Sequence, residues 1–275
     1  MFKHSGPHCA LPIGVFDSGV GGLTVVRALM ECLPFENIVY FGDTARVPYG
    51  IKSVQTIERY TSEITDFLLA HGVKLLIIAC NTIASVAQHV VKERASKAGI
   101  AVLDVIDAGA AAAALCSKSG HIGVIGTPTT INSNAYARRI YALNPAVRVF
   151  SQACPLFVPL VEEGWLDHQV TRLTAQEYLK PVLAEQVDTL VLGCTHYPLL
   201  KPLLRDLTHG KVDLVDSALT VAEQTARLLT GTELANKGNT PATTHYFVTD
   251  VPLRFQTIGE RFLGRALGSV EKVSL

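Results

Sequence analysis

The sequence lacks an excess of charge of either sign and any long hydrophobic run. Its 24 Lys and Arg equal its 24 Asp and Glu in number, so the charge balance indicates no nucleic acid or other polyanion as a partner. No apolar stretch approaches the ~18 residues of a membrane span, and the first residues lack the apolar segment of a signal peptide. We therefore expect a cytoplasmic protein that binds a small molecule and no membrane.

Closely spaced cysteines are also missing. Six cysteines are scattered without C-x-x-C spacing, which argues against disulfide bonds and against a structural zinc site. With 275 residues, 48% of them hydrophobic and 17% charged, the chain is long enough for one large or two medium globular domains. Most of the six are predicted to be ordinary core residues. The six are Cys9, Cys32, Cys80, Cys116, Cys154 and Cys194.

Two of these cysteines end similar segments. Residues 73–82 read VKLLIIACNT and residues 187–196 read VDTLVLGCTH. Such short apolar runs are typical of strands buried on both faces of a parallel sheet, and ligands bind at the carboxyl ends of these strands. A second match, between IGVFDS (13–18) and IGVIGT (122–127), has nearly the same spacing. The repeat predicts two similar halves, each presenting one cysteine to a shared cleft.

We therefore predict an α/β fold of two similar, doubly wound α/β domains related by pseudo-symmetry, with the active site in the cleft between them. The first domain is predicted to be discontinuous and to comprise residues 11–106 and 219–275, because the last part of the chain has no counterpart in the repeat. The second domain is predicted to comprise residues 107–218. Residues 1–10 are expected to form a flexible leader, and residues 155–165 fit no regular element.

The paired cysteines suggest proton chemistry. A lone cysteine at the end of an apolar strand is usually inert core, but Cys80 and Cys194 both precede hydrogen-bonding side chains and expected helix starts. A thiol beside a helix N-terminus or an imidazole has a lowered pKa and can act as a base. Two thiols across a cleft can take a proton from one face of a carbon and return one to the other. No context for a PLP-binding lysine is evident, so fixed donors would stabilise the carbanion-like transition state.

Five segments carry a family resemblance: IGVFDSGVGGLTV (13–25), YFGDTARVPYG (40–50), IACNTIAS (78–85), GVIGTPTTINSNAY (123–136) and LVLGCTHYPLL (190–200). On these segments, which lie in order across nearly the whole chain, the chain resembles the glutamate racemases of the aspartate/glutamate racemase superfamily. The resemblance implies interconversion of L- and D-glutamate without PLP or a metal ion. It also implies a homodimer and a role in supplying D-glutamate for peptidoglycan.

The resemblance implies roles for individual residues. Cys80 would exchange a proton with D-glutamate, assisted by Asp17, and Cys194 with L-glutamate, assisted by His196. From the residues alone, a structural role is favoured for both: a helix N-cap for Asp17, and a partly buried histidine with its hydrogen bonds satisfied for His196. The implied substrate contacts are Asp17, Ser18, Tyr49, Gly50, Asn81, Thr82, Thr195 and His196.

Three further residues are weaker candidates for substrate contact. Thr127 occupies the repeat position that corresponds to Ser18, and Thr130 follows it closely. Glu162 is expected to approach either the substrate ammonium or His196, with a solvated surface pair with Glu163 as the alternative. For the whole chain, two other functions stay open at this point: racemisation of aspartate or another amino acid, and a catalytically silent binding protein that has kept the cleft.

Overall fold

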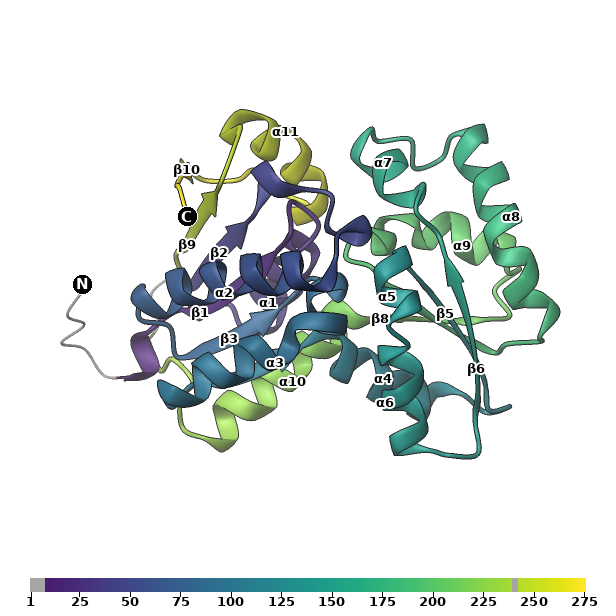
Figure 1. Ribbon diagram of the computed structural model, residues 1–275, viewed down its shortest axis with the longest axis horizontal. Helices are drawn as coiled ribbons and strands as arrows, with labels where there is room; N and C mark the ends of the chain where they lie inside the picture. The colour runs from purple at the N-terminus through teal and green to yellow at the C-terminus, as the bar shows by residue number, and fades with distance from the viewer. Residues whose placement is uncertain (1–7, 239–241) are drawn as a thin grey trace.

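Two parallel β-sheets with helices around them make up the computed structural model, which describes residues 8–238 and 242–275 (Figure 1). The predicted leader, residues 1–10, lies largely outside the described residues, and its last three residues form the short 3-10 helix η1 (His8–Ala10). Within the described ranges, no helix is both long and apolar enough to cross a membrane.

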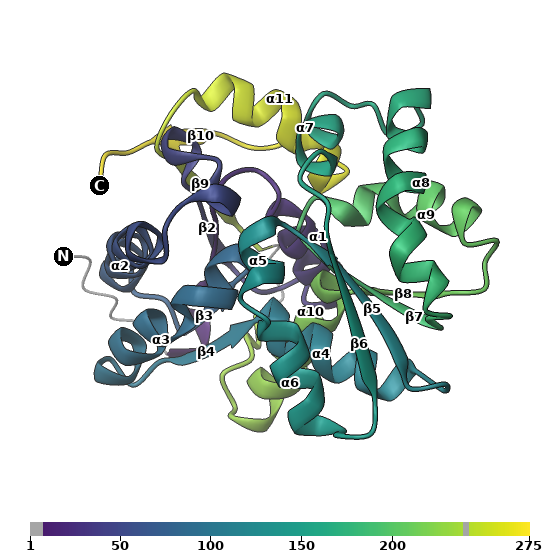
Figure 2. The same ribbon diagram turned by 45° about the vertical axis from the view of Figure 1, so that its right-hand side comes forward.

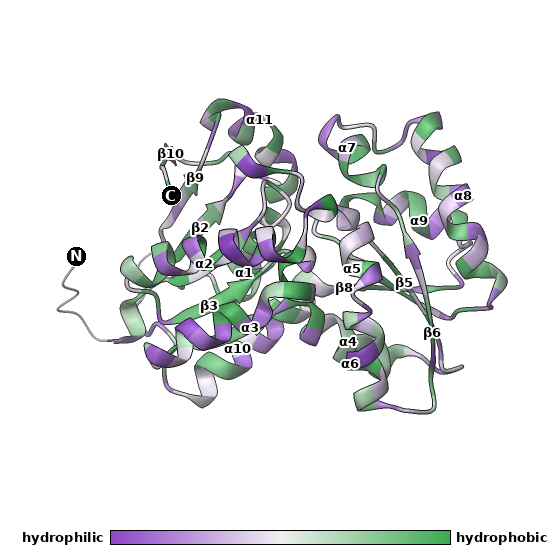
Figure 3. Ribbon diagram, in the orientation of Figure 1, coloured by the Kyte–Doolittle hydropathy of each residue, from purple (hydrophilic) through white to green (hydrophobic). Residues whose placement is uncertain are grey.

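The first sheet has six parallel strands in the order β10-β9-β2-β1-β3-β4. Strands β1, β2 and β3 are buried along their whole length, as expected for apolar strands covered on both faces. Strand β3 is correspondingly among the most hydrophobic segments in Figure 3. The strands are β1 (Ile13–Asp17), β2 (Ile38–Gly42), β3 (Leu75–Ile78), β4 (Ala101–Asp104), β9 (Thr244–Val248) and β10 (Val270–Lys272).

The second sheet has four parallel strands in the order β6-β5-β7-β8. They are β5 (His121–Gly126), β6 (Arg148–Ala153), β7 (Thr189–Gly193) and β8 (Asp213–Asp216). This order repeats the order β2-β1-β3-β4 of the first sheet, so the two sequence repeats correspond to the strand pairs β1/β5 and β3/β7. The predicted α/β fold with two similar halves is confirmed. The exact domain boundaries stay a prediction, although β9 and β10 do rejoin the first sheet.

Helices lie on both faces of the sheets (Figures 1 and 2). One expectation needs correction: residues 155–165, which fitted no regular element, contain helix α7. The α-helices are α1 (Leu23–Cys32), α2 (Val54–Ala70), α3 (Asn81–Lys97), α4 (Val105–Cys116), α5 (Pro128–Asn132), α6 (Ala135–Leu143), α7 (Phe157–Glu162), α8 (Gln169–Ala184), α9 (Lys201–Leu207), α10 (Ser217–Gly231) and α11 (Pro252–Leu263). Besides η1, the described residues form the short 3-10 helices η2 (Thr44–Arg46), η3 (Tyr49–Ile51) and η4 (Tyr197–Leu200).

The strand order creates two equivalent crevices. In each sheet the chain runs from a central strand to one neighbour and then crosses to the other side, so the strand order reverses between β1 and β3 and again between β5 and β7. Ligands of open α/β sheets bind at the carboxyl ends of strands at such switch points. Both predicted cysteines lie there, because Cys80 comes just after β3 and Cys194 just after β7.

Candidate active site

Cys80 lies between strand β3 and helix α3, where it is the N-cap residue of that helix. Its thiol donates to Ser18 Oγ at 3.6 Å, and only 5% of the residue is exposed. Burial, and then the negative charge of Asp17, raise the pKa of Cys80 to about 12. The expectation of a lowered pKa is therefore wrong for this thiol, because these two effects outweigh the hydrogen bonds offered by Ser18 and the helix start.

Asp17 ends strand β1 beside this thiol. Its Oδ1 accepts hydrogen bonds from Ser18 Oγ at 2.9 Å and from the Gly19 backbone N–H at 3.2 Å. Its Oδ2 is buried and has no hydrogen-bond partner among the described residues. The N-cap of α1 is Gly22, so the alternative interpretation of Asp17 as a helix cap is wrong. A buried carboxylate oxygen without a partner is instead available to a ligand that carries a proton or a positive charge.

The second cysteine belongs to a hydrogen-bonded chain of three side chains. Cys194 Sγ lies 3.9 Å from His196 Nδ1, and His196 Nε2 lies 2.9 Å from Glu162 Oε1. Burial opposes a charge on His196, but the hydrogen bonds and charges of Cys194 and Glu162 outweigh it and raise the pKa of His196 to about 10. Burial likewise opposes the Glu162 charge, yet the bond to His196 lowers the pKa of Glu162. An imidazolium thus faces the Cys194 sulfur near neutral pH.

The loops of the two halves meet at the site. Thr24 Oγ1, in the first turn of α1, donates to the Thr195 carbonyl at 3.1 Å. A Cβ atom added to Gly21 would lie 2.5 Å from His196 Nδ1, which is closer than real contacts allow. Only glycine therefore lets the turn after β1 approach the loop that carries Cys194. The sequence motif around Gly21 serves contact between the two halves.

Three predicted threonines form a second bridge between the halves. Thr82 Oγ1 lies 3.0 Å from Thr127 Oγ1, which in turn lies 3.0 Å from Thr130 Oγ1. Thr127 also caps helix α5 by accepting from the Thr130 backbone N–H at 3.3 Å. Gly50 lies beside these threonines, because its carbonyl accepts a hydrogen bond from the neighbouring Thr129 Oγ1 at 2.7 Å. These hydroxyls lie at the starts of α3 and α5, where backbone N–H groups favour an anion.

The remaining predicted residues hold the surroundings in place. Asn81 Oδ1 accepts from Tyr136 O–H at 2.7 Å, and that hydroxyl lies 3.0 Å from Ser217 Oγ. Tyr49, which is buried, donates to Asp43. In this structure the Oδ1 of Asn81 and the hydroxyl of Tyr49 therefore have protein partners. Their predicted contacts with substrate stay predictions.

Residues 13–225 match the model of the Asp/Glu/Hydantoin racemase family. The chain belongs to this family.

Individual relatives of this racemase-family chain are named glutamate racemase. A glutamate racemase of Syntrophus aciditrophicus is 67% identical over 264 residues, which cover 96% of this chain and 97% of that protein. A glutamate racemase of Neisseria gonorrhoeae is 60% identical over the same length, with the same coverage of both chains. The crystal structure of a Francisella tularensis glutamate racemase in complex with D-glutamate superimposes with a TM-score of 0.91 at 44% identity, over 97% of this chain and 98% of that one. The resemblance inferred from the motifs is confirmed.

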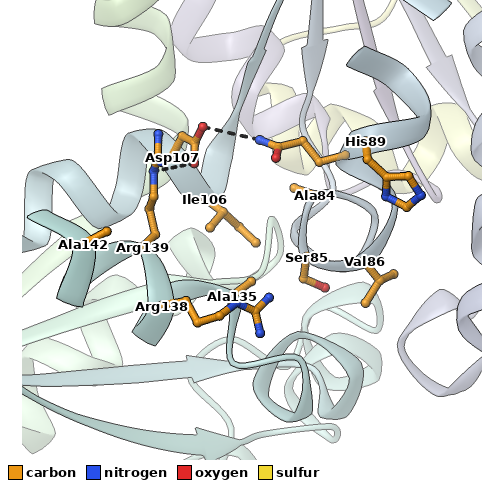
Figure 4. Close-up of a pocket in the computed structure, with 11 residues that line it drawn as sticks. Ala84, Ser85, Val86, His89, Ile106, Asp107, Ala135, Arg138, Arg139 and Ala142 are labelled. Carbon is orange, nitrogen blue, oxygen red and sulfur yellow. Dashed lines mark hydrogen bonds and ion pairs between the residues drawn. The ribbon is translucent and has the colours of Figure 1, made fainter. Parts of the chain in front are cut away.

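Cavity size alone does not locate the site of this racemase-family chain. A cavity that borders Cys194 measures about 10 Å³, roughly the volume that one water molecule needs. A groove of about 450 Å³ lies instead between α3, α4 and α6, where Asp107 pairs with Arg139 (Figure 4). None of the predicted site residues lines that groove. Cys80 and Cys194 are only 5% and 6% exposed, so the two halves are closed around them in this structure.

Sequence reasoning missed the contribution of the C-terminal helix α11. The Phe262 ring packs edge-on against the His196 ring, with their centroids 5.0 Å apart. This segment has no counterpart in the repeat, and no motif marked it. By contrast, the predicted approach of Glu162 to His196 is present, and the alternative of a solvated pair with Glu163 is wrong.

No group of three or more His, Cys, Asp or Glu side chains in the described ranges could hold a metal ion. The absence of PLP and metal from the reaction stays a prediction.

Proposed function

We propose that this chain is a glutamate racemase that interconverts L- and D-glutamate by proton transfer between Cα and two cysteines, without PLP or metal. The observation that carries the proposal is the placement of Cys80 and Cys194 at the carboxyl ends of equivalent strands, each with its own set of polar partners. The high identity to proteins named glutamate racemase supports glutamate, in preference to aspartate, as the substrate.

In the direction from L- to D-glutamate, Cys194 acts as the base. In its deprotonated form, beside the His196 imidazolium, it takes the Cα proton and becomes a thiol. Cys80 then donates its proton to the opposite face of Cα and becomes a thiolate. A raised pKa suits this role, because a thiol with a pKa of about 12 reaches the substrate protonated. Proton exchange with solvent restores the starting state, and the reverse direction exchanges the two roles.

Substrate binding is assigned to the fixed donors and acceptors around the thiols. Hydroxyls at the starts of α3 and α5, together with Ser18 and Thr195, suit a carboxylate, because they lie beside backbone N–H groups that favour an anion. The unpartnered Oδ2 of Asp17 suits the substrate ammonium. Enclosure by the two halves excludes water, which strengthens these interactions in the transition state. The proposal extends to a cytoplasmic homodimer that supplies D-glutamate for peptidoglycan.

The direct test is incubation of the purified protein with L-glutamate in D2O, with a chelator and without added PLP. We expect the optical activity to decay while deuterium enters Cα. Cys80→Ser and Cys194→Ser should each lower turnover by at least about 10³-fold, because each direction needs both proton sites and general acid–base groups contribute on this scale. Cys32→Ser, at an exposed cysteine, should leave turnover unchanged.

The outcomes separate the alternatives. Wild-type turnover in either of the two serine variants would disprove the assignment of two bases. Faster turnover of L-aspartate than of L-glutamate would assign a different substrate. Binding of glutamate with neither racemisation nor exchange at Cα would identify a silent binding protein.

A further inference from the structure

Helix α11 belongs to the first half by its connections but reaches the second half. It follows strand β9 of the first sheet and packs against α1, and its C-terminal end lies beside α7 (Figure 2). Two consecutive residues at this end make these contacts. Arg261 bonds to the backbone of Glu162, the hydrogen-bond partner of His196, and Phe262 packs against His196 itself. A helix of one half thus contacts the polar partners of the cysteine in the other half.

Arg261 makes two further hydrogen bonds that cross between the halves. One of its guanidinium nitrogens donates to the Val161 carbonyl at 3.2 Å and to the Glu162 carbonyl at 3.0 Å. Its guanidinium also lies over Gly164, where an added Cβ atom would come within 2.8 Å of it. Arg261 therefore binds the last turn of α7 at Glu162, the residue whose side chain is hydrogen-bonded to His196.

Phe262 contacts the other member of the Glu162–His196 pair. Its ring is 1% exposed and lies edge-on to the His196 ring. This packing limits side-chain rotation of His196, which would move the imidazole away from Cys194. Two side chains of α11 thus contact the backbone of Glu162 and the ring of His196.

The contact also lies near a cavity that both halves line. A cavity of about 240 Å³ is lined by Gly19 and Val20 of the first half, by Glu162 of the second half, and by Arg254 and Phe255 of α11. It therefore adjoins both the loop after Asp17 and the partner of His196. Arg261 lines an adjoining hollow of about 510 Å³ that shares Glu162 and Arg254 with this cavity. The contact between Arg261 and α7 therefore lies next to this cavity.

We infer that Arg261 is a positioning residue of the active site: it ties α11 to α7 across the mouth of the cleft, keeps Glu162 against His196, and limits access to Cys194. Its release opens this end of the cleft for substrate or product. In its catalytic meaning the inference rests on the proposed function, but the contact itself is tested without any substrate.

The test is alkylation of the substrate-free protein by iodoacetamide at fixed pH, followed at each cysteine by peptide mass spectrometry. Arg261→Met should raise the labelling rate of Cys194 about tenfold, the effect expected when a charged hydrogen bond that opposes opening is lost. Arg261→Lys keeps the charge and should restore most of the protection. Arg265→Met, at an exposed arginine four residues further on, should behave as the wild type.

Two other cysteines act as internal controls. Cys32 is exposed and should react equally in all variants, whereas Cys154 is buried in the second half and should stay unlabelled. An unchanged rate at Cys194 in Arg261→Met would overturn the inference, and so would a parallel rise at Cys154, which reports general loosening. Should the Met variant fail to fold, Arg261→Gln gives the same comparison. Selective labelling of Cys194 in a protein that does not racemise glutamate would keep the positioning role and disprove the proposed function.

Discussion

At the scale of single residues, the charge of His196 depends on Glu162. The pKa of His196 is raised from 6.5 to about 10, so the imidazolium persists at neutral pH and is lost as the pH rises through about 10. Glu162→Gln removes the facing negative charge but keeps a hydrogen-bonding amide. We expect the pKa of His196 to fall and the basic limb of the kcat/KM profile to move down by about one pH unit, as for loss of a nearby opposite charge.

The measurement is the pH dependence of glutamate racemisation in both directions. Glu163→Gln is the matched control, because it removes the same charge one residue further on, at an exposed position. A basic limb that stays in place in Glu162→Gln would show that the imidazolium does not control the reaction. A shift of equal size in both variants would indicate a general change in charge without a specific effect on His196.

At the scale of elements, the turn from β1 to α1 and the loop after β7 depend on Gly21 for their contact. Gly21→Ala would place a methyl group 2.5 Å from His196 Nδ1. Forcing an extra carbon into packed structure costs ~1–3 kcal/mol, and displacement of catalytic groups by about 1 Å can cost 10²-fold in rate. We expect kcat/KM to fall by about 10²-fold and the melting temperature to drop by a few degrees. Steady-state kinetics and thermal unfolding measure both.

Gly231→Ala is the control for that change. Gly231 ends helix α10, and nothing lies within 4 Å of a Cβ atom added there, so activity and stability should be unchanged. Wild-type kinetics in Gly21→Ala would show that the two loops move apart easily, and would contradict a close contact in the working enzyme.

The same elements show what the sequence could predict. Helix α1 begins at Leu23, directly after the glycines of the first motif. The buried strands β3 and β7 were recognisable because their apolar runs are flanked by clear turns. Helix α7 was missed because Pro155 precedes it and Pro159 lies inside it, and proline usually ends a helical pattern. Pro159 is tolerated because it is the third residue of α7, within the first turn, where backbone N–H groups have no partner inside the helix.

The site was predictable only where a motif or the repeat marked it. The groups around Cys80 and Cys194 follow equivalent strands, so strand order alone brings them to neighbouring crevices. Arg261 and Phe262 reach His196 through packing of α11 across the cleft, which depends on how the two halves sit together and leaves no local pattern. The raised pKa of Cys80 was missed for the same reason, since it follows from burial and from the charge of Asp17.

At the scale of the whole molecule, closure around the cysteines means that the halves must part for glutamate to enter. Trp165, the single tryptophan, reports on this motion because it follows Gly164, the residue under the Arg261 guanidinium, and is 45% exposed. Saturating D-glutamate should favour the closed form, decrease acrylamide quenching of Trp165 and shift its emission to the blue. L-lysine at the same concentration, which lacks the second carboxylate, should change neither.

Unchanged quenching under conditions where D-glutamate is turned over would show that the halves keep a fixed separation during the reaction. Substrate would then have to enter through side-chain motion alone.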